Sequence, residues 1–331
     1  MNCSLLGLKL SKALLGFLQY KTAEGLSPNT LLSYEYLLNL WASQIGADVE
    51  VGQITTQDLC NHIAWLRTEY KPRRFSGSEH PLSAKSVRNA WVALCAFFTW
   101  ASREFKIENP MKAVPAPRYE DPPIEPMTKE QIEALLKASE FCREAHTDRR
   151  KKFAKKRQTA KRDRAIILFL LDTGLRASEF CSLTIGDVEP KTGRVQVKHG
   201  REGGAKGSKG RVVYLGKSTR SALWRYLVER EDSSDPSAPL FTERAGRRLN
   251  KTALRELLTD LGRKVSIKKC YPHLFRHTFA ITYLRSGGDL FTLQALLGHS
   301  TLEMVQHYAR IAEVDVAEAH RRASPADNWH L

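Results

Sequence analysis

Hydrophobic residues in the first hundred positions recur every three or four residues, a spacing that predicts amphipathic helices. One helix follows Ser27 and Pro28, a favourable N-cap and first-turn pair, and another begins near Ser83. The apolar face of the second helix consists of Val87, Trp91, Leu94, Phe98 and Ala101. We therefore predict an all-helical N-terminal domain over residues 1–110.

A proline-rich stretch follows this helical region. Six of the 14 prolines lie between residues 110 and 126. Proline lacks an amide donor and restricts the residue before it, so this stretch excludes a long helix. We predict an interdomain linker over residues 111–126.

The remaining residues, 127–331, mix two periodicities. Thr128 and Gln131 have the spacing of a helix capping box, and the continuously apolar run 165–171 predicts a buried helix. Residues 194–198 and 211–215 alternate like strands on either side of a glycine-rich turn. Further helices are predicted at 252–264, 274–286 and 290–297. The predicted fold class is mainly α with a small β-sheet (α+β).

The charge of the chain is strongly positive and partly concentrated. Lys and Arg number 52 against 36 Asp and Glu, so 52 − 36 = +16. Residues 143–164 hold 11 basic and three acidic residues, so 11 − 3 = +8, half of the total. This run is either a solvated helix or mobile insertion, or an element that contacts phosphates. The overall charge indicates a polyanionic partner such as nucleic acid.

Several other classes of protein are disfavoured. The longest apolar runs, 91–98 and 165–171, are far shorter than the ~18 residues that a membrane span needs. Lys9 and Lys12 interrupt the apolar N-terminal stretch, so a signal peptide is not expected and we predict a cytoplasmic, nucleoid-associated protein. The six cysteines contain no CxxC pair, which argues against a disulfide framework or a zinc ribbon.

Residues suited to phosphate chemistry gather in four blocks of the second domain. These are Arg176 in TGLRASEF, Lys206 and Lys209 in the glycine-rich turn, His273 with Arg276 and His277 in HLFRH, and His299 followed by Tyr308. Displacement at phosphorus needs cations for the nonbridging oxygens, a nucleophile and a proton donor. Arginine forks, a phenol, and an ammonium or imidazolium can meet these needs.

Other interpretations of single residues are weaker. His273 and His277 have a spacing that zinc also uses, but Arg276 would place a positive charge beside the metal, so we expect no metal site. Glu179 is interpreted as an acid that anchors its helix, paired with Arg176 three residues earlier. His273 and His299 are the candidate bases for Tyr308, while His277 and His307 are interpreted as structural neighbours of the active groups.

In this order the residues resemble the tyrosine recombinase (phage integrase) family, which has Arg, Lys, His-x-x-Arg, His or Trp, and Tyr. The matching positions are Arg176, Lys206, His273, Arg276, His299 and Tyr308. The resemblance implies a helical core-binding domain and a mixed catalytic domain that form a C-shaped clamp around duplex DNA. It also implies a C-terminal arm, at about 314–331, that packs on a neighbouring protomer; the alternative is a flexible tail.

The same resemblance implies the reaction. Tyr308 would attack a phosphodiester and form a 3′-phosphotyrosyl link, with Arg176 and Arg276 stabilising the transition state. Lys206 would protonate the leaving 5′-oxygen, with Lys209 as the alternative, and His273 and His299 would assist proton transfer. One phosphodiester replaces another, so the reaction requires neither ATP nor a metal, and no cofactor is expected.

The expected partner is double-stranded DNA with inverted-repeat core sites, bound by a homotetramer, with an accessory DNA-bending or directionality factor as a further option. The 143–164 insertion favours the integrase of a phage, transposon or other mobile element. The alternatives are a chromosome-dimer resolvase of the same family, a type IB topoisomerase, and a DNA-binding protein without catalytic activity.

Direct DNA contacts are also expected. Lys85, Arg88 and Asn89 suit a major groove but can equally form a solvated face, and Lys209 and Arg211 suit backbone phosphates.

Overall fold

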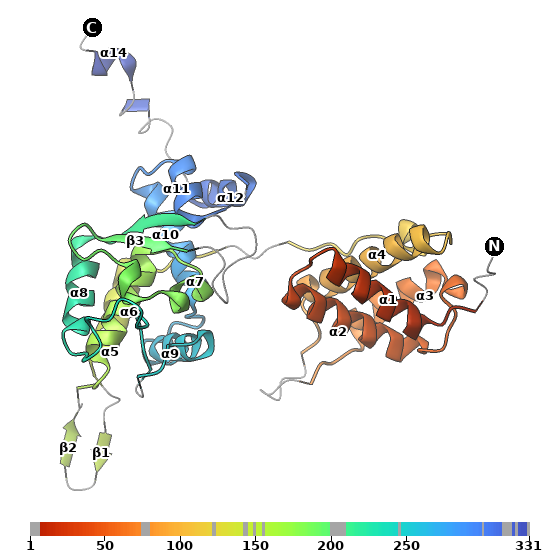
Figure 1. The fold of residues 1–331 in the computed structure, drawn as a ribbon, viewed down its shortest axis with the longest axis horizontal. Coiled ribbons are helices and arrows are strands. Elements are labelled where there is room, and N and C mark those ends of the chain that lie inside the picture. The colour runs from red at the N-terminus through yellow and green to blue at the C-terminus, as the bar shows by residue number, and fades with distance from the viewer. Residues whose placement is uncertain are drawn as a thin grey trace. The chain divides into compact units, whose positions relative to one another are not determined.

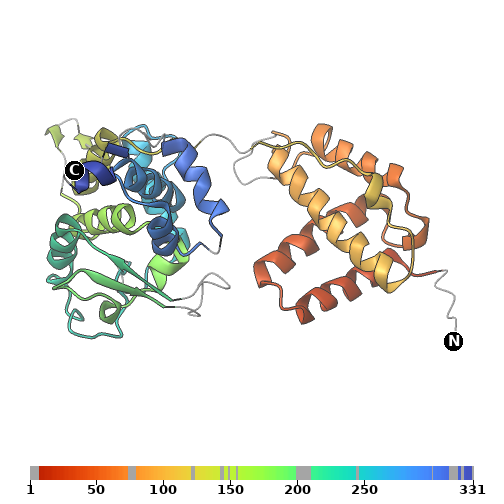
Figure 2. The same cartoon turned by 90° about the horizontal axis from the view of Figure 1, so that it is seen from above.

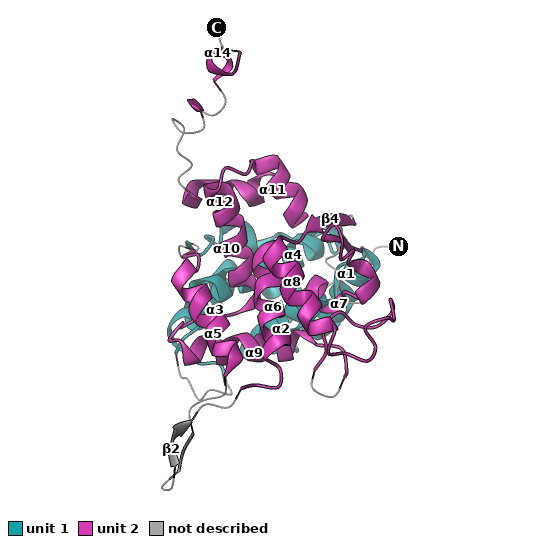
Figure 3. Cartoon of the chain, turned by 90° about the vertical axis from the view of Figure 1, so that its left-hand side faces the viewer, with its two compact units in different colours: residues 1–123 teal, residues 124–331 magenta. Residues whose placement is uncertain are grey.

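The computed structural model describes residues 7–73, 80–120, 124–141, 145–147, 150–153, 156–198, 210–243, 246–299, 301–312, 320–321 and 324–329. The chain divides into two compact units, residues 1–123 and 124–331 (Figure 3). The C-shaped clamp expected from the resemblance stays a prediction.

The first unit is helical, as predicted. Its helices are α1 (Leu10–Ala23), α2 (Pro28–Ile45), α3 (Thr56–Thr68) and α4 (Ala84–Glu104), with short 3₁₀ turns at Val51–Gln53 and Pro110–Ala113. The Ser27 and Ser83 hydroxyls accept hydrogen bonds from the first turns of α2 and α4, which confirms the predicted Ser27 cap and the predicted start of a helix near Ser83. Helix α4 contacts all three other helices (Figure 2). Its Phe97 and Phe98 are buried against Trp41 at the centre of the core.

The first half of the predicted linker packs on this unit. Met111 and Val114 are buried in its core, and the Trp91 indole N–H donates to the carbonyl of Val114 over 3.3 Å. Met127, the first residue after the predicted linker, belongs to the second unit, where its N–H donates to Thr278 Oγ1 over 3.0 Å. Met111 and Val114 thus belong to the packing of the first unit, because burial of apolar side chains is favourable.

The described residues of the second unit form helices and two small antiparallel strand pairs. Its helices are α5 (Lys129–Glu140), α6 (Ala160–Thr173), α7 (Ala177–Ser182), α8 (Lys217–Leu227), α9 (Lys251–Lys264), α10 (Pro272–Arg285), α11 (Leu290–Leu297), α12 (Glu303–Ala312) and α14 (Pro325–Asn328). Thr128 and Gln131 form the predicted capping box of α5. The buried helix α6 contacts α5, α8 and α10 (Figure 1) and thereby centres the core that supports the candidate site.

Strands β3 (Arg194–Val197) and β4 (Arg211–Tyr214) form the predicted antiparallel hairpin, with Val195 opposite Val213 and Val197 opposite Arg211. Their connection includes Lys206 and Lys209, which lie outside the described residues. The site expectations for these two lysines therefore stay predictions.

The basic run at 143–164 contains a second hairpin. Strands β1 (Ala145–Thr147) and β2 (Arg150–Phe153) pair in antiparallel fashion and lie beyond the end of α5 (Figure 1), in place of the solvated helix considered above. The chain returns to the body at Arg157, whose N–H donates to the Glu140 carbonyl over 2.9 Å and whose guanidinium pairs with buried Asp163 over 2.8 Å. Within the described ranges, no helix is long and apolar enough to cross a membrane.

Candidate active site

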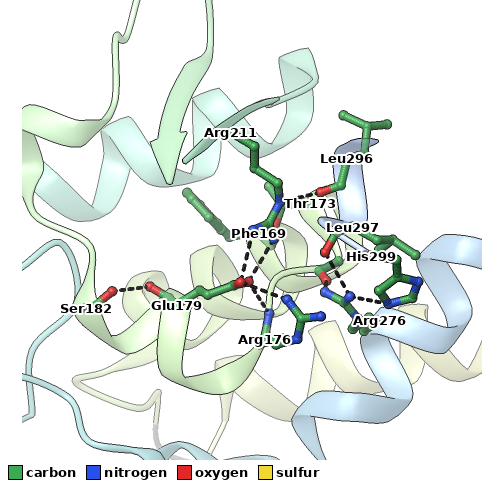
Figure 4. A network of polar contacts seen from close by, with 11 residues as sticks. Phe169, Thr173, Arg176, Glu179, Ser182, Arg211, Arg276, Leu296, Leu297 and His299 are labelled. Atoms are coloured by element: carbon green, nitrogen blue, oxygen red, sulfur yellow. Dashed lines mark hydrogen bonds and ion pairs between the residues drawn. The ribbon is translucent and has the colours of Figure 1, made fainter. Parts of the chain in front are cut away.

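The first part of the site is the turn between α6 and α7. Gly174 ends α6 in the left-handed region, with φ 58°, and the chain then enters α7 with Arg176 as its N-cap. The Arg176 backbone N–H donates to Glu179 Oε2 over 2.9 Å, and its Nη1 donates to Oε1 over 3.1 Å (Figure 4). Glu179 is thus the helix-anchoring partner of Arg176 that its i+3 spacing predicted.

Glu179 also binds a second guanidinium, that of Arg211 on β4. Arg211 Nη1 and Nη2 donate to the two carboxylate oxygens over 2.9 and 2.8 Å (Figure 4). Burial alone would raise the pKa of Glu179, but the hydrogen bonds and charge of Arg211, with those of Arg176, lower it to about 2. The carboxylate is therefore ionised at neutral pH.

The environment of Arg211 departs from the expected phosphate contact. Its side chain is 8% exposed, and its Nε donates to the Leu296 carbonyl over 2.6 Å, so the guanidinium is bound within the protein. The alternation of strand residues is a sequence signal for this placement. Arg211, Val213 and Leu215 share one strand face, and the latter two are buried.

Arg276 on α10 joins two further segments to the site. It is 1% exposed, and its Nη1 donates to the Gly174 carbonyl over 2.9 Å. Its Nη2 donates to the Leu297 carbonyl over 2.9 Å and lies 2.7 Å from His299 Nε2 (Figure 4). Burial and then the charge of Arg176 lower the pKa of Arg276 to about 10, so it stays cationic at neutral pH.

His299 is held neutral by its surroundings. Burial, followed by the charges of Arg276 and Arg176, lowers its pKa to about 4. Because a guanidinium only donates hydrogen bonds, His299 Nε2 accepts one and the ring proton lies on Nδ1. This Nδ1 is buried and has no hydrogen-bond partner among the residues described.

Tyr308 on α12 lies in the same cluster of polar side chains. It is 4% exposed, and burial raises its pKa, although Arg276 and Arg176 act in the opposite direction. Its hydroxyl is hydrogen bonded to His277 Nδ1 over 2.9 Å, and its ring stacks on that of His299 with centroids 6.4 Å apart. Burial lowers the pKa of His277 to about 4, so this imidazole is neutral.

The structure thus brings Tyr308 to His277 as well as to the candidate base His299. His273, the other candidate base, touches the ring of His277 with centroids 4.2 Å apart. Its pKa is lowered by burial and by the charges of Arg276 and Arg176. His273 and His277 are four residues apart, so both lie on one face of α10. The sequence spacing alone therefore does not decide which of them contacts Tyr308.

The predicted groove-binding residues lie on α4 in the other unit. Lys85 lies over the Tyr119 ring at 5.3 Å, and Arg88 lies over the Trp91 ring at 4.7 Å while donating to the Pro117 carbonyl. Asn89 is exposed. Within the described part of the chain, no group of three His, Cys, Asp or Glu residues is arranged to hold a metal ion.

Models of known protein families match both units of the chain. The model of the "Phage integrase family" matches residues 125–314, and that of the "Phage integrase, N-terminal SAM-like domain" matches residues 15–105. Tyrosine recombinase XerC of Bacillus subtilis (strain 168) is 32% identical over 242 residues, covering 71% of this chain and 73% of the relative. Tyrosine recombinase XerA of Pyrococcus furiosus is 29% identical over 326 residues, 96% of each chain.

Solved structures show the same fold. The Tn1549 transposon integrase in complex with circular intermediate DNA has a TM-score of 0.70 and 21% identity, covering 91% of this chain and 95% of that one. A lambda integrase dimer bound to a core site has a TM-score of 0.67 and 16% identity, covering 90% and 97%. Together with the two family models, which match both units, these findings confirm the resemblance drawn from the motifs: the chain belongs to the phage integrase family, the tyrosine recombinases, enzymes that cleave and rejoin DNA.

Proposed function

We propose that this chain is a site-specific DNA recombinase in which Tyr308 is the nucleophile. The observation that carries the proposal is the position of the Tyr308 hydroxyl, hydrogen bonded to His277 and within the electrostatic influence of Arg176 and Arg276. A buried phenol beside two guanidiniums suits attack on a phosphodiester, whose transition state gathers negative charge.

In the proposed cleavage step, the Tyr308 oxygen attacks phosphorus, a Tyr308–phosphate bond forms, and the bond from phosphorus to the 5′-oxygen breaks. The phenol proton passes to a neutral imidazole, for which His277 Nδ1 at 2.9 Å is well placed. Lys206 supplies a proton to the leaving 5′-oxygen, as the resemblance implies.

The other site residues act on the phosphate. Arg176 and Arg276 bind its nonbridging oxygens, and the buried Nδ1–H of His299 supplies a further hydrogen bond. His273 assists proton transfer. Arg276 is 1% and Tyr308 4% exposed, so cleavage requires DNA binding to open the site. Rejoining is the reverse reaction with a different 5′-hydroxyl.

For the biological role we propose the integrase of a phage, transposon or other mobile element. The hairpin inserted between α5 and α6 and the similarity of fold to the Tn1549 integrase support this role. The relatives named XerC and XerA instead favour a chromosome-dimer resolvase, which is the alternative. In both roles the partner is double-stranded DNA with inverted-repeat core sites, bound by a homotetramer that an accessory bending or directionality factor can assist.

The test uses covalent capture. The wild-type chain, Tyr308→Phe and the control Tyr214→Phe are mixed with a library of nicked random duplexes from which the cut fragment escapes. The proteins are denatured, and DNA that stays attached is sequenced. Tyr214 is a suitable control because it is a tyrosine of the same unit, 60% exposed on β4. Equal DNA binding by all three proteins is verified beforehand.

We expect adducts from the wild type and Tyr214→Phe that share an inverted-repeat motif, and none from Tyr308→Phe. Adducts without a common sequence would favour a type IB topoisomerase. Binding without adducts from the wild type would favour a DNA-binding protein without catalytic activity. Adducts from Tyr308→Phe would remove Tyr308 from the role of nucleophile.

A further inference from the structure

Arg211 connects three segments of the site, although it is not one of the catalytic residues that the resemblance implies. It lies at the start of β4, five residues after Lys206 in the sequence. Its two terminal nitrogens bind Glu179 on α7, and its Nε binds the carbonyl of Leu296 near the end of α11. One guanidinium therefore joins strand β4, helix α7, whose N-cap is Arg176, and the end of α11, which leads to His299 (Figure 4).

Charge gives this connection a chemical role. Glu179 contacts both Arg176 and Arg211, so the three side chains together carry one net positive charge. Without Arg211, the charges of Glu179 and Arg176 would cancel in a buried setting, where charge interactions are stronger than in water. Arg176 would then be held by the carboxylate and would attract a phosphate less strongly.

Packing at Gly298 shows how closely the guanidinium fits. Gly298 ends α11 in the left-handed region, with φ 64°. A Cβ atom there would lie 3.0 Å from Arg211 Nη1 and 3.2 Å from its Cζ. The backbone just before His299 thus lies directly against the guanidinium, and a change at Arg211 removes support from this turn.

We propose that Arg211 is a positioning residue of the recombination reaction, which neutralises Glu179 so that the charge of Arg176 remains available to the DNA phosphate, and which supports the turn carrying His299. This inference rests on the proposed function. It replaces the expectation that Arg211 contacts a DNA phosphate directly.

The test separates binding from cleavage. Variants Arg211→Met, Arg211→Lys and the double variant Arg211→Met with Glu179→Gln are compared with the wild type. Arg194→Met is the matched control, because Arg194 is an exposed arginine on the other strand of the same hairpin whose guanidinium donates to Gln196. The dissociation constant for a nicked duplex and the single-turnover cleavage rate at saturating DNA are both measured, and folding is checked by circular dichroism.

We expect Arg211→Met to cleave about 100-fold more slowly while its dissociation constant stays within about threefold. The double variant should cleave at least about tenfold faster than Arg211→Met, because Glu179→Gln removes the unpaired carboxylate. Arg211→Lys should lie between the wild type and Arg211→Met, since lysine keeps the charge but loses the two-pronged contact. Arg194→Met should match the wild type.

Removing one partner of a buried ion pair can prevent folding. The double variant removes both members of the buried Arg211–Glu179 pair, so it takes the place of Arg211→Met if that variant does not fold. It should then bind DNA normally and cleave more slowly than the wild type, because the contact to Leu296 is lost. Normal cleavage by the variants, no rescue by Glu179→Gln, or a defect confined to the dissociation constant would each overturn the inference.

A second measurement does not depend on cleavage. The Glu179 carboxyl carbon is followed by NMR during a pH titration, with its signal assigned by its absence from Glu179→Gln. The pKa of Glu179, about 2 in the wild type, should rise clearly in Arg211→Met, which removes the charge, and less in Arg211→Lys, which keeps it. An unchanged pKa would contradict the neutralising role. If the wild type forms no DNA adduct, the proposed function fails, and this titration still decides whether Arg211 neutralises Glu179.

Discussion

At the scale of single residues, the positive charge of the site comes from arginine and not from histidine. His277 and His299 both have pKa values lowered to about 4, so they are neutral at pH 7, while Arg276 keeps its charge. Burial is the first cause for each histidine, and the nearby cations add to it. Neutral imidazoles beside fixed cations are suited to moving protons while the guanidiniums bind a phosphate.

The planar guanidinium of Arg176, with its paired hydrogen-bond donors, leads to a prediction for Arg176→Lys. Lysine keeps the charge but cannot give paired, fixed donors to Glu179 and to a phosphate oxygen. We expect single-turnover cleavage of a nicked duplex to fall about 100-fold, with DNA affinity within about threefold. Arg194→Lys is the control and should cleave normally. Near-normal cleavage by Arg176→Lys would remove Arg176 from its assigned role.

At the scale of elements, glycines at helix ends set the approach of segments to the site. Gly174 ends α6 with φ 58°, and its carbonyl accepts the hydrogen bond from Arg276. A Cβ at this position would lie 2.4 Å from Cδ1 of Phe279 on α10. Glycine is required here both for the backbone conformation and for close packing of α10.

We predict that Gly174→Ala destabilises the second unit by about 3 kcal/mol, the sum of left-handed strain and steric overlap. Gly246→Ala isolates the left-handed strain, because Gly246 also has a positive φ, 75°, but, apart from its chain neighbours, no described residue has an atom within 4 Å of its Cβ position. It should cost about 1 kcal/mol. Denaturant unfolding of both variants measures the difference, and equal losses would contradict the packing argument.

At the scale of the whole molecule, the net charge of +16 should dominate DNA affinity. Lysine and arginine displace counterions from DNA, so binding weakens as salt is added. We expect the dissociation constant of Tyr308→Phe, used to prevent cleavage, to rise at least about 100-fold between 50 and 200 mM salt. Fluorescence anisotropy measures it, with sucrose as the osmotic control. A change below about threefold would contradict a binding mode based on phosphate contacts.

Much of this protein was predictable from local sequence. The Ser27 cap, the capping box at Thr128 and the strands around the glycine-rich turn depend on residues close in sequence, whose spacing decides their conformation. The order of the motif residues led to the correct family. Periodicity and motif spacing were therefore enough for the fold class and the family.

The tertiary structure decided which of these residues meet. Arg211 binds Glu179, 32 positions earlier, and not a solvent-facing partner, and Tyr308 contacts His277 over a separation of 31. Met111 and Val114, within a stretch that prolines mark as a linker, join the first core. Sequence spacing fixes the conformation of near neighbours, but the partner of a buried charge is decided by which distant segments the packed core brings within hydrogen-bond distance.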